Sequence, residues 1–185
     1  MIAISENIQL VEITINDHKK LMDLACKIYP PEYLHLWENN DCSWYLNRCY
    51  DLANFKEELS EAHSNYYFVL YKSKVEGFIR FVYNKPFDPF SDTSETYLHR
   101  IYLSQESQGT GIAQQLLNWI EQKSKENGMG SVWLEAMDTK ERAIQFYKKT
   151  GFKILSTKLL NFELMLPVIE ECTLCVKIYH NFSLH

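Results

Sequence analysis

The sequence predicts an α/β protein in which one mixed β-sheet carries helices on both faces. Segments rich in β-branched and aromatic residues alternate along the chain with amphipathic segments of helical period. The 185 residues are 46% hydrophobic and 23% charged, which is ordinary for a globular protein and sufficient for a hydrophobic core. With no internal repeat, linker or low-complexity tract, we expect one domain over residues 1–185 with about seven strands and about four to five helices.

The first elements are a strand and a helix. Residues 8–15 alternate apolar with polar side chains, approximately the period of a half-buried strand. Asp17 offers an N-cap for the amphipathic helix that follows, and Pro30 and Pro31 are expected to stop that helix. Two further helices are expected between residues 32 and 62.

The middle of the chain predicts three more strands. Residues 66–71 and 75–83 are apolar and aromatic runs separated by a short Lys-Ser-Lys turn, which indicates an antiparallel hairpin. Residues 84–94 contain two prolines and predict a loop, and residues 96–103 predict the next strand. The remaining segments continue the alternation: a helix from residue 112, a strand over 131–137, a helix over 139–150 that Gly151 ends, and strands over 152–156 and about 173–179.

Composition also excludes several classes of function. The 19 basic and 24 acidic side chains give a net charge of −5, which argues against nucleic-acid binding. The deficit lies in residues 1–99, with 9 basic and 15 acidic side chains, whereas residues 100–185 have 10 basic and 9 acidic ones. No apolar run is long enough for a membrane helix and no signal peptide begins the chain, so we expect a soluble, cytoplasmic protein without a membrane partner.

The five cysteines include one C-x-x-C pair, Cys172 and Cys175. Such a pair is typical of a redox site or of half a zinc site. Residues three apart on the strand expected here point to opposite faces, and no second C-x-x-C is present. We therefore expect ordinary reduced thiols and no metal.

A glycine-rich hexapeptide, Gln108-Gly109-Thr110-Gly111-Ile112-Ala113, joins a strand to a helix. Glycines let the backbone turn tightly and bring successive N–H groups to an anion, and the helix N-terminus adds its partial positive charge. The segment is therefore a candidate pyrophosphate-binding loop, with a plain glycine turn as the alternative. No lysine follows the glycines, which excludes a P-loop, and Gln114 stands where a dinucleotide fingerprint needs Gly or Ala.

Two blocks of the sequence resemble the GNAT acetyltransferases. Gln108, Gly111 and Ala113 match the family's motif A, and residues 143–152 resemble its Ala-x-x-x-Tyr-x-x-x-Gly-Phe block. The resemblance implies a mixed, splayed sheet, acetyl-CoA as acetyl donor, and transfer of the acetyl group to an amine. It divides the chain into an acceptor-side half over about residues 1–95 and an acetyl-CoA-binding core over about 96–155.

A narrower likeness, over about residues 40–155, is to the bacterial PaiA-type polyamine (spermidine/spermine) N-acetyltransferases. The matching pieces are Trp44-Tyr45-Leu46 with Tyr50, Phe55-x-x-Glu58-Leu59, residues 64–68 and residues 98–103. A small polyamine is therefore the first acceptor expected, and acidic residues such as Glu57, Glu58 and Glu61 are suited to attract a polycation.

The resemblance also implies the residues that hold the cofactor. Backbone groups of Ile101, Tyr102 and Leu103 would bind the pantetheine arm, and N–H groups from Gln108 to Ala113 the pyrophosphate. Lys140 stands where relatives have Asn, and it is expected either to pair with a phosphate or to be a solvated helix residue.

Three side chains are candidates for the chemistry of transfer. Tyr147 matches the family tyrosine that donates a proton to the CoA thiolate, with a core aromatic as the alternative. Glu135 is the first candidate for the base and His99 the second, and a water-relayed path is a third option.

Two other functions remain open from the sequence: a protein N-terminal or lysine acetyltransferase, and a non-catalytic acyl-CoA-binding regulatory module. Residues 159–169 are rich in apolar side chains and offer a contact for a homodimer.

Overall fold

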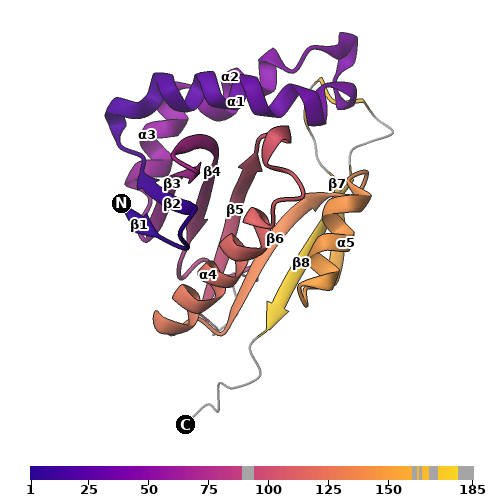
Figure 1. Ribbon diagram of the computed structural model, residues 1–185. Helices are drawn as coiled ribbons and strands as arrows, with labels where there is room; N and C mark the ends of the chain where they lie inside the picture. The colour runs from indigo at the N-terminus through magenta and orange to yellow at the C-terminus, as the bar shows by residue number, and fades with distance from the viewer. Residues whose placement is uncertain (89–93, 160–161, 163, 167–170, 179–185) are drawn as a thin grey trace.

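We describe a computed structural model of the chain, covering residues 1–88, 94–159, 162, 164–166 and 171–178. Within these residues the strands form one eight-stranded sheet in the order β1-β2-β3-β4-β5-β6-β8-β7 (Figure 1). The strands are β1 Ile2–Ala3, β2 Ile8–Glu12, β3 Ser64–Tyr71, β4 Lys74–Val82, β5 Glu95–Leu103, β6 Ser131–Met137, β7 Lys153–Leu159 and β8 Glu171–Ile178.

Helices cover both faces of this sheet, as the sequence predicts. The helices are α1 His18–Tyr33, α2 Ser43–Tyr50, α3 Leu52–Ser60, α4 Ile112–Glu126 and α5 Glu141–Lys149. Figure 1 shows α1, α2 and α3 on one side of the sheet and α4 and α5 on the other. The mixed α/β class is confirmed, and the strand beyond the expected seven is the two-residue β1, too short to leave a periodic pattern.

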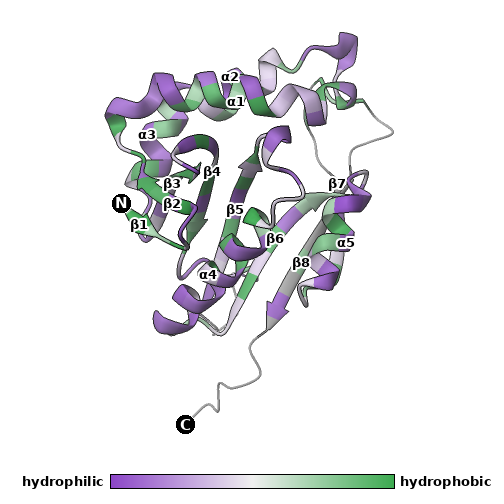
Figure 2. Cartoon of the chain, in the orientation of Figure 1, coloured by the Kyte–Doolittle hydropathy of each residue, from purple (hydrophilic) through white to green (hydrophobic). Residues whose placement is uncertain are grey.

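Each face of the sheet has its own hydrophobic core. One core packs α4 and α5 on the sheet, with Leu116 and Ile120 completely buried. The other packs α1, α2 and α3 on the opposite face, with Phe68 at its centre. Figure 2 shows hydrophobic residues along the central strands and hydrophilic residues on the outer side of α4. Because one side of α4 is buried and the other is exposed, its apolar residues recur with the helical period of about 3.6, which the sequence shows.

The feature that positions the site is the divergence of β5 from β6. These two strands are parallel and pair from Glu95↔Ser131 to Leu98↔Leu134. Beyond that point β5 stays paired with β4 as far as Leu103, and β6 stays paired with β8 as far as Met137. The last residues of β5 and of β6 therefore form no backbone hydrogen bonds with each other, and each strand has a free edge on that side.

The prediction that Pro30 and Pro31 end the first helix is wrong. Helix α1 continues to Tyr33, and the N–H of Leu34 donates to the carbonyl of Pro30. A proline lacks its own N–H but keeps its carbonyl, so the last turn can still be closed. The ring of Tyr33 stacks on that of Tyr29, with centroids 4.6 Å apart, and this contact holds the turn.

Other boundaries shift by a few residues. Strand β2 ends at Glu12, and α5 begins at Glu141, two residues later than expected. The predicted hairpin is confirmed: β3 and β4 are antiparallel, and Lys72 and Ser73 between them both have positive φ. Tyr179 and most of the 159–169 run lie outside the described residues.

No described helix has the length and apolar character needed to span a bilayer. Among the described residues, no group of three or more His, Cys, Asp or Glu side chains is arranged to hold a metal ion. Cys175 of the C-x-x-C pair is a buried free thiol on β8.

Candidate active site

A cavity of about 260 Å³ lies where β5 and β6 diverge, between the two helical layers. Leu98 and Leu134, the last paired residues, line it from the sheet. Helix α1 contributes Tyr29 and Tyr33, and α5 contributes Tyr147. The cavity thus runs through the sheet and is reached by side chains from both faces.

Six of the residues predicted for the site line this cavity: His99, Ile101, Tyr102, Glu135, Lys140 and Tyr147. They come from β5, β6, the N-cap of α5 and α5 itself, so residues 48 positions apart in the sequence meet at one place. Leu103, the last residue of β5, and the loop from Gln108 to Ala113, which follows β5 in the chain, do not line the cavity.

The glycine-rich loop has the backbone that the sequence predicts. Gly109 and Gly111 have φ of 73° and 81°, a region that disfavours other residues, and Gly111 is the N-cap of α4. The first N–H groups of an α-helix have no acceptor within it and point outward. A Cβ at either glycine would meet nothing within 4 Å, so no neighbouring residue crowds the loop at these two positions. These residues fit a pyrophosphate.

Lys140 is not the solvated helix residue that was one of the two expectations for it, since its side chain is 18% exposed. Its Nζ donates to the backbone carbonyl of Glu32 and lies 3.3 Å from the Glu32 carboxylate, and it sits 4.6 Å from the centre of the Tyr33 ring. Glu32 in turn accepts hydrogen bonds from Gln108 at 3.0 Å and Gln105 at 3.4 Å. These donors lower the pKa of the Glu32 carboxyl against the effect of its burial. One carboxylate of α1 therefore links the glycine loop to the start of α5.

Tyr147 is nearly buried, with 8% of its surface exposed, and it packs edge-on against Phe152. Burial raises the pKa of its phenol well above the usual value, helped by Cys175 and Tyr102. The hydroxyl therefore stays protonated at neutral pH, as a proton donor must. Its side chain is part of the core, as the alternative reading expected, and lines the cavity as well.

Glu135 lies on β6 just past the last residue paired with β5. Its side chain is one-quarter exposed and forms an ion pair with Lys158 of β7. Among the described residues that line the cavity, Glu135 is the one carboxylate.

His99 is tied to the arginines beside it. Arg80 donates from Nη1 to Nδ1 of His99. Because arginine has only donors, Nδ1 must be the acceptor, and the ring proton of the neutral imidazole is on Nε2. Burial lowers the pKa of His99 well below its usual value, and the charges of Arg100, Arg80 and Lys85 lower it further.

Sequence reasoning missed the ion pairs that flank the cavity. Arg100 donates to both oxygens of Glu58 at 2.5 and 2.6 Å, and Arg80 pairs with Glu61. Both arginines are almost fully buried. Arg100 and Glu58 are 42 positions apart, so their contact leaves no local pattern in the sequence. For this reason the sequence does not reveal that Glu58 and Glu61, two of the acidic residues expected to attract a polycation, already bind arginine.

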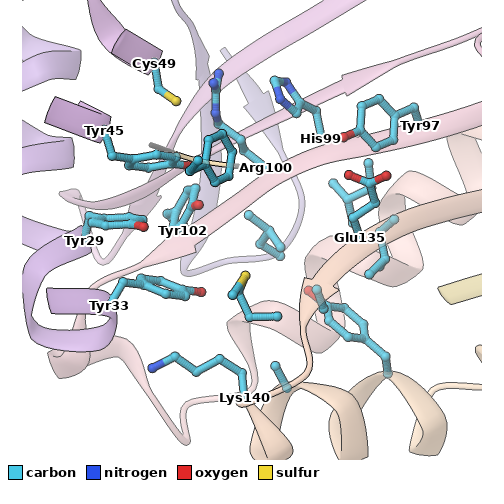
Figure 3. Close-up of a pocket in the computed structure, with 18 of the residues that line it drawn as sticks. Tyr29, Tyr33, Tyr45, Cys49, Tyr97, His99, Arg100, Tyr102, Glu135 and Lys140 are labelled. Atoms are coloured by element: carbon cyan, nitrogen blue, oxygen red, sulfur yellow. The ribbon is translucent and has the colours of Figure 1, made fainter. Parts of the chain in front are cut away.

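A wall of tyrosines, also missed, forms the side of the cavity under α1 and α2. Tyr29 stacks on Tyr33 and Tyr45 with centroids 4.6 and 4.7 Å apart, and Tyr102 meets Tyr29 edge-on. Figure 3 shows these four tyrosines along one side of the cavity and Glu135 on the other. The high aromatic content, 14% of the chain, was the only signal of such a wall.

Comparisons with known proteins agree with this architecture. The model of the "Acetyltransferase (GNAT) family" matches residues 19–152. An uncharacterized N-acetyltransferase in the pepI 3′ region of Lactobacillus delbrueckii subsp. lactis is 20% identical over 144 residues, covering 78% of this chain and 83% of that protein.

Two solved structures show the same fold. The PaiA N-acetyltransferase of Thermoplasma acidophilum, in complex with coenzyme A, has a TM-score of 0.70 at 19% identity and covers 93% of this chain and 99% of its own. Naa50 of Arabidopsis thaliana, in complex with a bisubstrate analogue, has a TM-score of 0.65 at 19% identity, covering 94% and 99%. The family model spans most of the chain and both of its motif blocks, so the chain belongs to the GNAT family of acetyltransferases.

Proposed function

We propose that the protein transfers the acetyl group of acetyl-CoA directly to a primary amine, with both substrates bound at once. The observation that carries this proposal is the cavity at the divergence of β5 and β6. Glu135 of β6 and Tyr147 of α5 both line it, and the glycine loop follows β5, which lines it as well. A thioester is already activated, so positioning and two proton transfers suffice.

The donor is held mainly by backbone. The N–H groups of Gly109, Gly111, Ile112 and Ala113 bind the pyrophosphate at the start of α4. Those of Gln108 and Thr110 already donate to the carbonyls of Gln105 and Ser107. The edge of β5 from Ile101 to Leu103 no longer pairs with β6. Its backbone groups can therefore bond the amide groups of the pantetheine arm as they would bond a neighbouring strand. Lys140 acts through Glu32 rather than on a phosphate.

The chemistry then needs one base and one acid. Glu135 takes a proton from the acceptor ammonium, directly or through a water, and the free amine attacks the thioester carbonyl carbon. The C–N bond forms as the C–S bond breaks, and Tyr147 gives its proton to the leaving thiolate. His99 presents Nε2–H rather than a lone pair, so it serves as a hydrogen-bond donor and not as the base.

For the acceptor we propose a primary amine with a single positive charge. The described cavity lining supplies one carboxylate, Glu135, together with the cations Arg100 and Lys140. A polyamine, the acceptor expected from the sequence, would place its second ammonium near those cations or near Glu58 and Glu61, whose carboxylates already bind arginine. The tyrosine wall favours an uncharged apolar or aromatic body on the amine.

A panel of amines with acetyl-CoA, followed by thiol release, tests the proposal. We expect an arylalkyl monoamine to have a kcat/KM about tenfold or more above that of spermidine, because a second ammonium meets like charge. Faster turnover of spermidine would restore the polyamine assignment, and turnover of a peptide alone would make the enzyme a protein acetyltransferase. Tight binding of acetyl-CoA without thiol release for any amine would indicate a non-catalytic module.

A further inference from the structure

The ammonium group of Lys158 forms an ion pair with Glu135, the carboxylate that lines the cavity. Lys158 extends from β7 across β8, and its Nζ contacts Oε1 of Glu135 on β6. The two residues are brought together by register: Lys158 pairs with Cys172 on one side of β8, and Cys172 pairs with Met137 on the other. Both side chains are therefore held over the same stretch of sheet.

This ion pair has the composition of an acceptor complex. A primary alkylammonium on a flexible four-carbon chain, paired with the carboxylate assigned as base, is what a bound monoamine substrate would present. The Lys158 side chain is 55% exposed, so it is not committed to the core. The two cations that line the cavity are held elsewhere: Lys140 by Glu32 and Arg100 by Glu58, two carboxylates outside the cavity lining.

We propose that Lys158 is an internal acceptor, acetylated on Nζ by the enzyme's own active site when no free amine occupies the cavity. This inference rests on the proposed function. Glu135 takes one proton from the Lys158 ammonium, and the Nζ lone pair attacks the thioester carbonyl carbon of acetyl-CoA. An amide bond forms as the C–S bond breaks, and CoA leaves as the thiol with the proton from Tyr147.

The experiment is incubation of the full chain with acetyl-CoA, without an amine, followed by proteolysis and mass spectrometry of each lysine over time. Lys153, an exposed residue of the same strand, is the matched control for uncatalysed acetylation of surface lysines. Because proximity replaces a bimolecular encounter, we expect Lys158 to react about tenfold or more faster than Lys153. The rate at Lys158 should be independent of protein concentration, and Tyr147→Phe should reduce it to that of Lys153.

Equal rates at Lys158 and Lys153, a Lys158 rate unchanged by Tyr147→Phe, or a rate that rises with protein concentration would overturn the inference. Its failure is distinguishable from failure of the proposed function. If free amines are acetylated while Lys158 stays unmodified, only the internal acceptor is wrong. If neither free amines nor Lys158 are acetylated, the proposed function is wrong too.

Discussion

Leu98 and Leu134 form the last residue pair between β5 and β6, and both line the cavity that begins beside them. Glu135 follows Leu134 directly and His99 follows Leu98, so the first residue past the pair on each strand carries a titratable side chain. The position at which pairing between β5 and β6 ends therefore determines where His99 and Glu135 reach the cavity.

Replacing Tyr147 by Phe removes the hydroxyl and keeps the ring in the core. We expect kcat to fall by about 100-fold, the lower range for loss of a general acid, with unchanged affinity for acetyl-CoA. Steady-state kinetics and calorimetric binding measure the two quantities. Tyr67→Phe, at a half-buried tyrosine outside the cavity, is the control and should change neither. An unchanged kcat would remove Tyr147 from the mechanism.

Glu135→Gln and His99→Gln distinguish the two candidates for the base. Glutamine at 135 keeps the shape but cannot take a proton, so we expect kcat to fall by about 100-fold. Glutamine at 99 can still donate a hydrogen bond, so its loss should be several times smaller. Single-turnover rates with saturating amine measure both variants, and the reverse order would make His99 the base.

His99 should make the fold sensitive to mild acid. Its pKa is lowered by burial and by Arg100, Arg80 and Lys85, in spite of the Glu58 carboxylate 3.8 Å away. The unfolded chain therefore binds a proton at higher pH than the folded one, and stability falls as pH drops below about 6.5. Urea unfolding between neutral pH and pH of about 5 should show a smaller loss in His99→Gln. An identical pH dependence in the variant would contradict this role.

The buried ion pair of Arg100 with Glu58 should be costly to break from one side. Arg100→Met leaves the Glu58 carboxylate without its bidentate partner, and we expect a loss of about 3 to 5 kcal/mol in the free energy of unfolding. Denaturant titration measures it. Lys19→Met, in the exposed pair with Asp23, is the control and should cost less than about 1 kcal/mol. A similar small effect at Arg100 would show that the pair is solvated.

Gly111→Ala tests the conformation of the loop rather than its space. An alanine Cβ would meet nothing within 4 Å, but φ of 81° is a left-handed conformation that costs an L-residue about 1–2 kcal/mol. We expect weaker binding of acetyl-CoA, by about tenfold, as the loop relaxes away from that conformation. Gly130→Ala is the control, because its Cβ would make only an ordinary contact, 3.8 Å from the Ser94 carbonyl. Equal affinities in the two variants would contradict the role of the loop backbone.

The features of the fold that the sequence predicts are those that depend on residues close together in the chain. The strand over 131–137 and the helix from residue 112 were located correctly, because a buried face requires apolar side chains at regular intervals within a few consecutive residues. The glycine loop was recognisable for the same reason, since glycine adopts positive φ at the least cost and two glycines lie close together at this strand-to-helix junction. Helix α1 runs past the predicted end, because the stacking of Tyr33 on Tyr29 outweighs the low helix propensity of Pro30.

The site itself was less accessible. The resemblance named Tyr147, Glu135 and His99, and the structure brings all three to one cavity. The partners that define their states come from distant segments: Arg80 for His99, and Lys158 for Glu135. These contacts depend on strand register, which alternation along one strand does not reveal.

The divergence of β5 and β6 also bears on solubility. Unpaired strand edges normally invite pairing with a second chain, and proteins shield or interrupt them at the rim of a sheet. Here two such edges lie in the middle of the sheet, between Tyr33 of α1 on one side and Tyr147 of α5 on the other. The molecule thereby keeps backbone groups available for a small ligand without offering them to another protein as a template for aggregation.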